Sequence, residues 1–240
     1  MAWYCTAWID KDPGKDLMNL TQNIQRLKNS LPDYVTLVAV SKTKSVEDIL
    51  EVYRSGHKIF GENRVQELVS KAESLPDDIQ WHMVGHLQTN KVKYIAPFIH
   101  LIQSVDSLKL LTVINSEAEK ANRVINVLLQ IHISSEDTKY GLSEEEIIQM
   151  LSSSEYAHLS GIRVRGLMGM ATFTQDEQVI RQEFSYLSDV FRRIKDRFFG
   201  QDPDFCELSM GMSGDYLLAI EEGSTMIRVG TLIFGERFKL

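Results

Sequence analysis

Short apolar runs recur along the chain, and their length and content of β-branched residues predict buried β-strands. Eight such runs occur, at residues 35–41, 57–60, 80–84, 99–104, 124–132, 162–168, 205–209 and 225–229. Other stretches carry apolar residues at steps of three and four, which predicts amphipathic helices at 15–31, 45–56, 64–75, 108–122 and 176–198. Strands and helices therefore alternate for most of the chain.

This alternation indicates a parallel sheet, because a helix commonly returns the chain to the start of the next strand. Eight strand-and-helix units within 240 residues predict one closed (β/α)8 barrel of the TIM type. An open, doubly wound sheet is the alternative that the pattern leaves. No linker, low-complexity tract or long charge block divides the chain. We therefore expect one barrel domain at 13–240, preceded by an extension at 1–12 to which we assign no role.

The net charge of −7 argues against general affinity for nucleic acid or for an anionic membrane, but it is compatible with a pocket for a single phosphate. The two cysteines, Cys5 and Cys206, belong to no CxxC motif or Cys/His cluster, so neither a metal site nor a disulfide framework is predicted. The N-terminus does not resemble a signal peptide, and no apolar run reaches the roughly 18 residues needed to cross a bilayer. We expect a cytoplasmic protein with reduced thiols.

Polar residues and glycines follow most of the apolar runs. In a (β/α) barrel the C-terminal ends of the strands form one rim, and function collects there. Six of the eight runs have such endings, which begin at Ser41, Gly61, Gly85, Gly166, Ser209 and Arg228. One ending of this kind would mean little, but six on one rim predict a ligand site.

The last two endings are typical of a phosphate site, which in these barrels forms from the loops after strands seven and eight. Ser213 stands before the helical stretch DYLLAIEEG, where it would act as the N-cap and present its hydroxyl to an anion. Gly230 and Thr231 would add backbone N–H donors where no side chain blocks the approach. For each loop taken alone, the alternative to a phosphate site is a purely structural role: Ser213 would only cap a helix, and Gly230 would only permit a turn.

Lys42 directly follows the first buried run, where a charged amine is costly unless it has a partner or loses its proton. A lysine that forms a Schiff base needs that loss, because only the neutral amine attacks an aldehyde. Lys44 lies two residues on, and the two side chains would point the same way if the strand persisted. Lys44 also precedes Ser45, a predicted N-cap, so we expect Lys44 to lie nearer to water. The alternative for Lys42 is a rim lysine that extends into solvent.

The motifs AVSKTKS, GENRVQEL, WHMVGHLQTNK, QSVDS, GLMGMA and LSMGMSGDYLLAIEEGSTMIRVGTLIFG occur in this order along the chain. In these motifs the chain resembles the pyridoxal phosphate homeostasis protein family, the single-domain relatives of the alanine-racemase barrel. The similarity spans roughly residues 17 to 237. The resemblance implies that Lys42 binds pyridoxal 5′-phosphate (PLP) as a Schiff base and that Arg228 faces the pyridine nitrogen. It further implies that the phosphate is held by Ser213, Gly230 and Thr231 and that the ring is lined by Asn63, His86 and Met168.

An arginine at the pyridine nitrogen bears on the activity. A carboxylate there would keep the nitrogen protonated and make the ring a strong electron sink. Arg228, which stays cationic, would favour the unprotonated ring and so weakens the case for transamination. Racemisation needs a base on each face of the substrate carbanion. Lys42 would supply one of them, but the spacing does not indicate His86 or Tyr140 as the other.

The first hypothesis is therefore a protein that is not an enzyme, one that holds PLP and delivers it, as the family resemblance implies. PLP-accepting apo-enzymes are the expected partners. The first alternative is a low-activity amino-acid racemase. The second alternative is a Schiff-base aldolase that uses Lys42 without PLP. The chain stops at Leu240. We expect a monomer, because the dimer-forming domain of the racemase is absent from this sequence.

Overall fold

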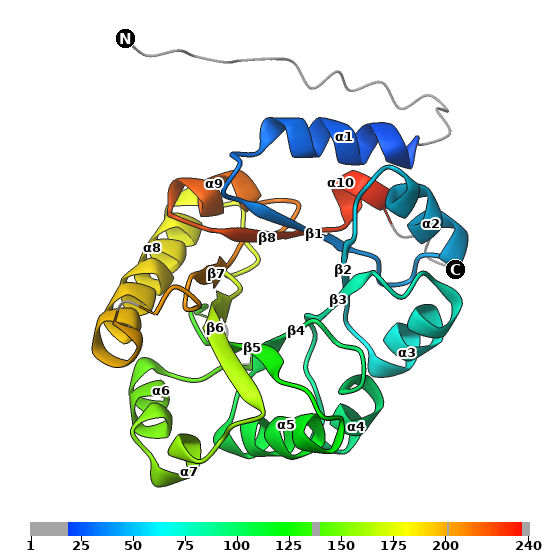
Figure 1. Ribbon diagram of the computed structural model, residues 1–240. Coiled ribbons are helices and arrows are strands. Elements are labelled where there is room, and N and C mark those ends of the chain that lie inside the picture. Colours follow the sequence, from blue (N-terminus) through cyan, green and yellow to red (C-terminus); the bar gives the residue numbers. More distant parts are fainter. Residues whose placement is uncertain (1–18, 136–139, 201, 237–240) are drawn as a thin grey trace.

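A computed structural model describes residues 19–135, 140–200 and 202–236. Its strands form one closed parallel barrel in which every strand pairs with the next and β8 returns to β1 (Figure 1). The strands are β1 (Thr36–Val40), β2 (Ile59–Glu62), β3 (Gln80–Met83), β4 (Leu101–Val105), β5 (Ile125–Ile131), β6 (Ile162–Gly169), β7 (Glu207–Ser209) and β8 (Met226–Val229). All eight predicted strands are confirmed, and the open sheet is excluded because β1 and β8 are paired.

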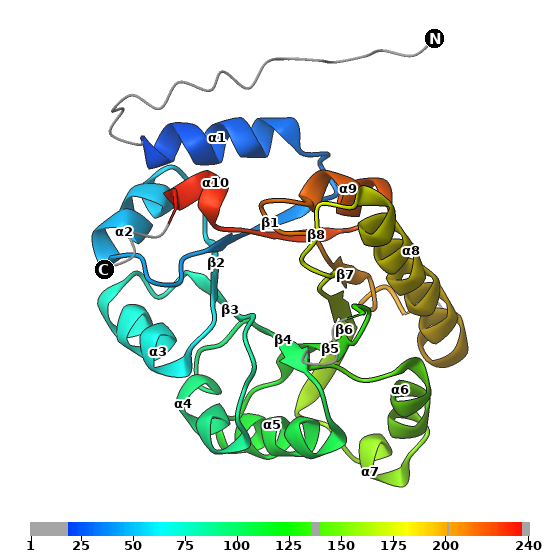
Figure 2. The same cartoon turned by 180° about the vertical axis from the view of Figure 1, so that it is seen from behind.

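The helices form an outer ring around these strands, as Figures 1 and 2 show from opposite sides. The α-helices are α1 (Leu20–Ser30), α2 (Val46–Arg54), α3 (Val65–Ser74), α4 (Val92–Ile95), α5 (Leu108–Lys120), α6 (Glu144–Leu151), α7 (Ser154–Ala157), α8 (Glu177–Ile194), α9 (Tyr216–Glu221) and α10 (Thr231–Phe234). A short 3₁₀ turn, Thr89–Lys91, leads into α4, and a π-helical turn, Lys195–Phe199, ends α8. In the described part of the chain, no helix is both long and apolar enough to span a bilayer.

Local sequence signals fix where two of these helices begin. Ser45 forms a capping box with Asp48 at the start of α2, and Ser143 forms one with Glu146 at the start of α6. Each box satisfies backbone N–H groups that would otherwise lack a partner. The Ser45 cap is the one expected from the sequence. The predicted extension at 1–12 and the beginning of the first predicted helix lie outside the described residues.

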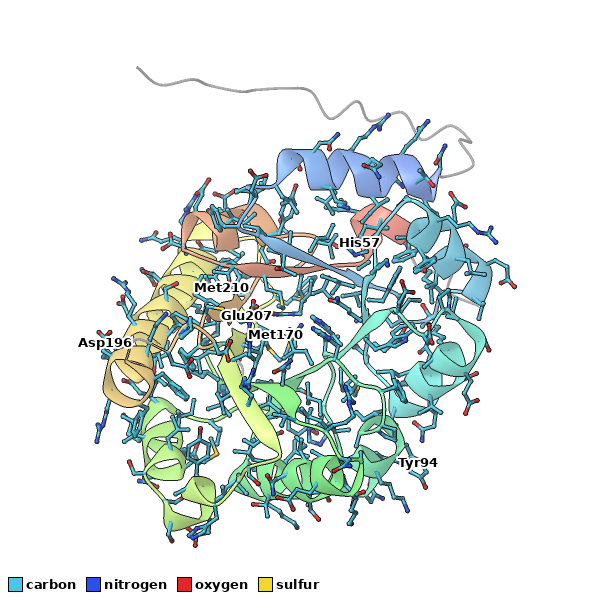
Figure 3. All side chains as sticks on the ribbon, viewed as in Figure 1. His57, Tyr94, Met170, Asp196, Glu207 and Met210 are labelled. Carbon is cyan, nitrogen blue, oxygen red and sulfur yellow. The ribbon has the colours of Figure 1, made fainter. Side chains whose placement is uncertain are left out.

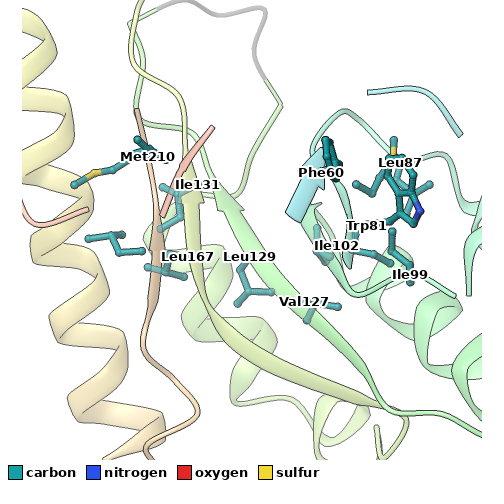
Figure 4. Packing of buried hydrophobic residues seen from close by; sticks show 14 of the residues in the cluster. Phe60, Trp81, Leu87, Ile99, Ile102, Val127, Leu129, Ile131, Leu167 and Met210 are labelled. Atoms are coloured by element: carbon teal, nitrogen blue, oxygen red, sulfur yellow. The ribbon is translucent and has the colours of Figure 1, made fainter. Parts of the chain in front are cut away.

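The core has two parts, because successive side chains of each strand face opposite sides of the barrel wall. The larger part lies between the strands and the helices, and Figure 4 shows a portion of it around Phe60, Trp81 and Leu87. The smaller part fills the barrel interior and consists of Val38, Leu101, Leu128, Met168 and Met226. This interior plug leaves only the end of the barrel beyond it for a ligand.

Candidate functional site

Lys42 and the two predicted phosphate loops lie on neighbouring strands, because closure of the barrel pairs β1 with β8. Val38 is level with Arg228 in this pair. Farther along the same strands, a Cβ atom built on Gly230 would lie 3.0 Å from the carbonyl oxygen of Val40. Residues 190 positions apart in sequence thus meet at one place on the rim, and the chain reaches Lys42 just beyond it.

Strand alternation, continued beyond the end of β1 at Val40, predicts that the Lys42 side chain lies on the inward-facing side. Val38 belongs to the interior core, and alternation then assigns Val40 and Lys42 to the same side. Ser41 faces the other way and is fully buried against Glu62 of β2, to which its hydroxyl donates a hydrogen bond of 2.6 Å. Lys42 itself is half-buried. This placement agrees with the expectation that its stem is enclosed.

Lys44 does not share that direction, because the strand ends at Val40 and the chain turns. The Lys44 N–H donates to the Ser41 carbonyl at 3.0 Å, which closes a β-turn with Thr43 at its third position. Thr43 has a φ of 66°, in the left-handed region that a β-branched residue rarely adopts. Such a residue costs on the order of 1–3 kcal/mol and persists only where its surroundings impose it.

The amine of Lys44 does not extend freely into water. Lys44 is half-buried, as Lys42 is, and its amine donates to the Phe234 carbonyl at 2.8 Å and to the Gly235 carbonyl at 3.4 Å. These carbonyls lie at the C-terminal end of α10, where the negative end of the helix dipole attracts a cation. The two lysines are therefore separated by direction, one toward the interior and one toward α10.

Arg228 is buried inside the barrel, with 5% of its surface exposed. One guanidinium nitrogen donates to the Ser209 hydroxyl at 2.6 Å and another to the Gly169 carbonyl at 2.9 Å. Burial lowers the pKa of Arg228 to about 10, and the charge of Asp215 opposes that shift. The side chain therefore remains cationic at neutral pH, and its two hydrogen bonds to described residues leave further N–H donors for a ligand.

A chain of buried hydrogen bonds connects Arg228, through Ser209, to Gln103 and His82. The Ser209 hydroxyl donates to the Gln103 Oε1 at 2.7 Å, and the Gln103 amide nitrogen lies 2.9 Å from His82 Nδ1. Burial lowers the pKa of His82 to about 3, so this imidazole is neutral and its Nδ1 accepts the amide hydrogen. The sequence did not indicate Gln103 or His82, because both lie inside strands and not in the rim loops.

The two predicted phosphate loops are joined by a hydrogen bond. The Gly230 N–H donates to the Ser213 hydroxyl at 3.3 Å. Ser213 is not the N-cap of α9, contrary to the prediction: the cap is Asp215, whose carboxylate accepts the N–H of Met212. The helix begins two residues later than expected because that short hydrogen-bonded turn precedes it. Thr231 is exposed and opens α10, with Gly230 as the N-cap.

Ser213→Ala should weaken the binding of a phosphorylated ligand by roughly 1–2 kcal/mol, or about 5- to 30-fold in Kd. The variant loses a hydroxyl that would donate to the phosphate and that also links this loop to Gly230. Titration with PLP measures the change. Ser45→Ala is a suitable control, since Ser45 is exposed and caps α2 at the outside of the barrel. Equal affinities for wild type and S213A would remove Ser213 from the phosphate site.

The three residues expected to line the ring occupy different depths. Asn63 is half-buried after β2, and its backbone packs against Gly85, where a Cβ would lie 2.5 Å from the Asn63 carbonyl oxygen. Met168 is fully buried in the interior core. Met170 follows it on the same side of the chain, is only half-buried and lies within the ring of strands in Figure 3, so it is a further candidate that the sequence reading omitted.

His86 lies at the rim and is partly exposed. Its Nδ1 lies 3.2 Å from the Asp106 Oδ2, and its ring stacks on Tyr140 with a centroid distance of 4.0 Å. The stack joins the loop after β3 to the loop after β5. His86 is therefore a packed rim residue, which is the simpler of the two roles considered for it. Among the described residues, no group of three or more His, Cys, Asp or Glu side chains is placed to hold a metal ion.

The fold and this rim define a class of protein: a closed (β/α)8 barrel with a lysine after β1 and glycine and hydroxyl groups after β7 and β8. The alanine racemase N-terminal domain model matches residues 15–238. The chain belongs to this family and, within it, to the pyridoxal phosphate homeostasis proteins, as the resemblance implied.

Individual relatives show how far the similarity extends. The chain is 36% identical over 236 residues to the pyridoxal phosphate homeostasis protein of Vibrio alginolyticus, covering 92% of this chain and 99% of that one. It is 40% identical over 203 residues to the protein of the same name from Aquifex aeolicus, covering 84% and 86%. PipY of Synechococcus elongatus, solved with PLP bound, superposes with a TM-score of 0.81 at 32% identity, covering 90% of this chain and all of PipY.

Proposed function

We propose that this protein binds PLP as a Schiff base on Lys42 and holds it for delivery, as a carrier that serves PLP homeostasis. The observation that carries the proposal is the pairing of β1 with β8, in which Val38 is level with Arg228. This pairing supports a site shared by Lys42, which follows β1, and the loops after β7 and β8. The PLP-bound structure of PipY supports the choice of ligand. PLP-accepting apo-enzymes are the partners we propose, and a monomer remains the expected state.

The residues at the rim fit each part of PLP. Lys42 has the amine that a Schiff base requires, and when bound the cofactor supplies an electrophilic aldehyde to it. Ser213, Gly230 and Thr231 offer a hydroxyl and backbone N–H groups to the phosphate. Arg228 offers N–H donors toward the ring nitrogen, and Asn63 and His86 stand at the rim after β2 and β3. Met168 would close the floor beneath the ring.

Arg228 argues against transamination. A cationic guanidinium can donate a hydrogen bond only to an unprotonated pyridine nitrogen, and the unprotonated ring withdraws electrons weakly. The support from Ser209 and Gly169 holds the guanidinium in the interior. Nothing comparable fixes a second base: His86 is bound by Asp106 and covered by Tyr140. Proton removal from an amino-acid substrate is therefore poorly supported.

Two measurements test the proposal. The purified protein should absorb visible light after incubation with PLP, and borohydride should fix the colour covalently. A Schiff-base aldolase would instead be trapped with a sugar phosphate in the absence of PLP. Interconversion of D- and L-amino acids by the PLP-loaded protein should stay at the rate of free PLP, and a clear excess would replace the carrier proposal with the racemase alternative.

Arg228→Glu should let the pyridine nitrogen hold a proton, since a carboxylate stabilises that charge. We expect the absorbance of bound PLP, and its dependence on pH, to change relative to wild type. Arg228→Gln is the matched control, because it removes the positive charge without adding a negative one. Thermal unfolding of both variants reports whether the barrel tolerates them. If R228E binds PLP with the wild-type spectrum, Arg228 does not contact the nitrogen.

A further inference from the structure

A buried cluster of charged residues lies behind Lys42, on the outer side of the barrel wall. Lys71 of α3 is at its centre, with 7% of its side chain exposed. Its ammonium group donates to three acceptors: the Ser41 carbonyl at 2.8 Å, the Glu62 Oε1 at 2.8 Å and the Glu67 Oε1 at 2.6 Å. Each N–H of the ammonium therefore has a partner, which is the condition under which a charged lysine remains buried.

The cluster contacts both chain neighbours of Lys42. On one side, the Ser41 hydroxyl donates to Glu62 and the Ser41 carbonyl accepts from Lys71. On the other side, the Thr43 N–H donates to the Glu67 Oε1 at 2.5 Å. Thr43 is the residue in the left-handed conformation. Because Lys71 joins Glu62 and Glu67, the two halves of the turn are held by one connected set of hydrogen bonds.

Glu62 is an unusual residue for a structural ion pair. Its side chain is completely buried, and among the described residues its Oε2 atom has no hydrogen-bond partner. Burial raises the pKa of Glu62, whereas the hydrogen bonds from Lys71 and Ser41 oppose that shift. A buried carboxylate with an unmatched oxygen destabilises a fold unless its partners compensate. Here the partners of the carboxylate are the Lys71 ammonium and the hydroxyl of Ser41, the residue before the candidate Schiff-base lysine.

We propose that Lys71, Glu62 and Glu67 are positioning residues for Lys42, which hold the turn from Ser41 to Lys44 in its strained form and thereby direct the Lys42 side chain into the barrel. The proposal rests on the proposed function of Lys42. The three residues act through the backbone on either side of Lys42. They face the helices, away from the interior, so they would not touch the ligand.

This arrangement explains why the turn can contain a threonine. A glycine would adopt a positive φ at the third position of the turn without help, but it would also leave the backbone free to change conformation. Threonine disfavours that conformation, so its geometry depends on the hydrogen bond to Glu67. The direction of Lys42 is then coupled to the charge cluster. Lys44, on the other side of Thr43, is directed to α10 by the same turn.

The test compares the rate at which PLP forms the borohydride-trappable adduct with Lys42. The double variant Glu62→Gln/Lys71→Met removes both buried charges together, so it should fold with a melting temperature near that of wild type. We expect the adduct to form at least about tenfold more slowly, because small displacements of a reacting group reduce rates strongly. Lys58→Met is the control: Lys58 pairs with Asp78 at the surface, and its loss should leave the rate unchanged.

A rescue distinguishes positioning from general damage. Adding Thr43→Gly to the double variant should restore most of the rate, because glycine adopts the turn conformation unaided. A variant damaged only in stability would gain nothing specific from this change. If the double variant does not fold, Glu67→Ala provides the test, since Glu67 is partly exposed and its loss frees the Thr43 N–H while Glu62 and Lys71 stay paired. This variant should form the adduct several-fold more slowly.

The outcomes separate this proposal from the proposed function. If wild-type protein gives no trapped adduct on Lys42, the proposed function fails before the cluster is tested. If wild type gives the adduct and the folded double variant, or E67A in its place, forms it at the wild-type rate, the positioning role is overturned while PLP binding stands. A slow variant that Thr43→Gly does not accelerate would also contradict the proposal, because its defect would not lie in the turn.

Discussion

Lys42→Ala should abolish the borohydride-trapped PLP adduct and leave the barrel folded. The loss should be complete, because no other group takes the place of an amine at that carbon. Lys42 is half-buried in a turn outside both hydrophobic cores, so its truncation creates no core cavity. Peptide mapping after reduction locates the pyridoxyl group in wild type, and circular dichroism confirms the fold of the variant.

Lys44→Ala is the matched control for this experiment. Lys44 lies two residues away, carries the same functional group and is equally half-buried, yet its amine is bound to the carbonyls that end α10. Its removal should cost about 1 kcal/mol of stability, the net value of one such hydrogen bond. The adduct should still form. A pyridoxyl group on Lys44, or on neither lysine, would overturn the assignment of the Schiff base.

The barrel and the rim could be predicted from the sequence because both depend on local patterns. The alternation of apolar runs and amphipathic stretches predicts parallel strands, and their number favours closure. The pairing of β1 with β8 then excludes the open sheet. Lys42 could be singled out as a candidate site residue because it follows the first apolar run, and this required no information about its neighbours in space. Gly230 was indicated in the same way, and the structure brings its loop to Ser213.

Long-range contacts account for what the sequence did not reveal. Thr43 adopts a conformation that its own side chain disfavours, and the hydrogen bond that supports it comes from Glu67, 24 residues away. The direction of Lys44 is set by a carbonyl 190 residues away. Gln103 connects His82, 21 residues before it, to Ser209, 106 residues after it. No local pattern contains these contacts.

The error at α9 has a different origin. Ser213 and Asp215 are both good N-cap residues, and the sequence alone does not decide between them. In the structure the Asp215 carboxylate accepts the Met212 N–H, which forms a turn over Ser213 and delays the helix. The serine hydroxyl is then not needed as a helix cap. It accepts from Gly230 instead, which leaves its own hydrogen to donate to a ligand.

Gly230→Val should lower the affinity for PLP at least about 100-fold. A phosphate at this site would receive charge-assisted hydrogen bonds from the backbone after β8, each worth roughly 1.5–3 kcal/mol, and the loss of two of them corresponds to that factor. A branched side chain would occupy the space through which the phosphate approaches. Titration with PLP, followed by absorbance, gives the change in Kd.

The experiment must distinguish damage to the fold from loss of phosphate binding, because a Cβ on Gly230 would already lie 3.0 Å from the Val40 carbonyl oxygen. Pyridoxal, which has the same aldehyde and ring but no phosphate, provides that separation. Wild type should prefer PLP to pyridoxal strongly, whereas G230V should lose most of this preference and still form the pyridoxal adduct on Lys42. Gly214→Ala is the control for the loop after β7, since a Cβ there meets nothing within 4 Å. A G230V protein that keeps its preference for PLP would place the phosphate elsewhere on the rim, whereas loss of both adducts would report damage to β1 and not to a phosphate site.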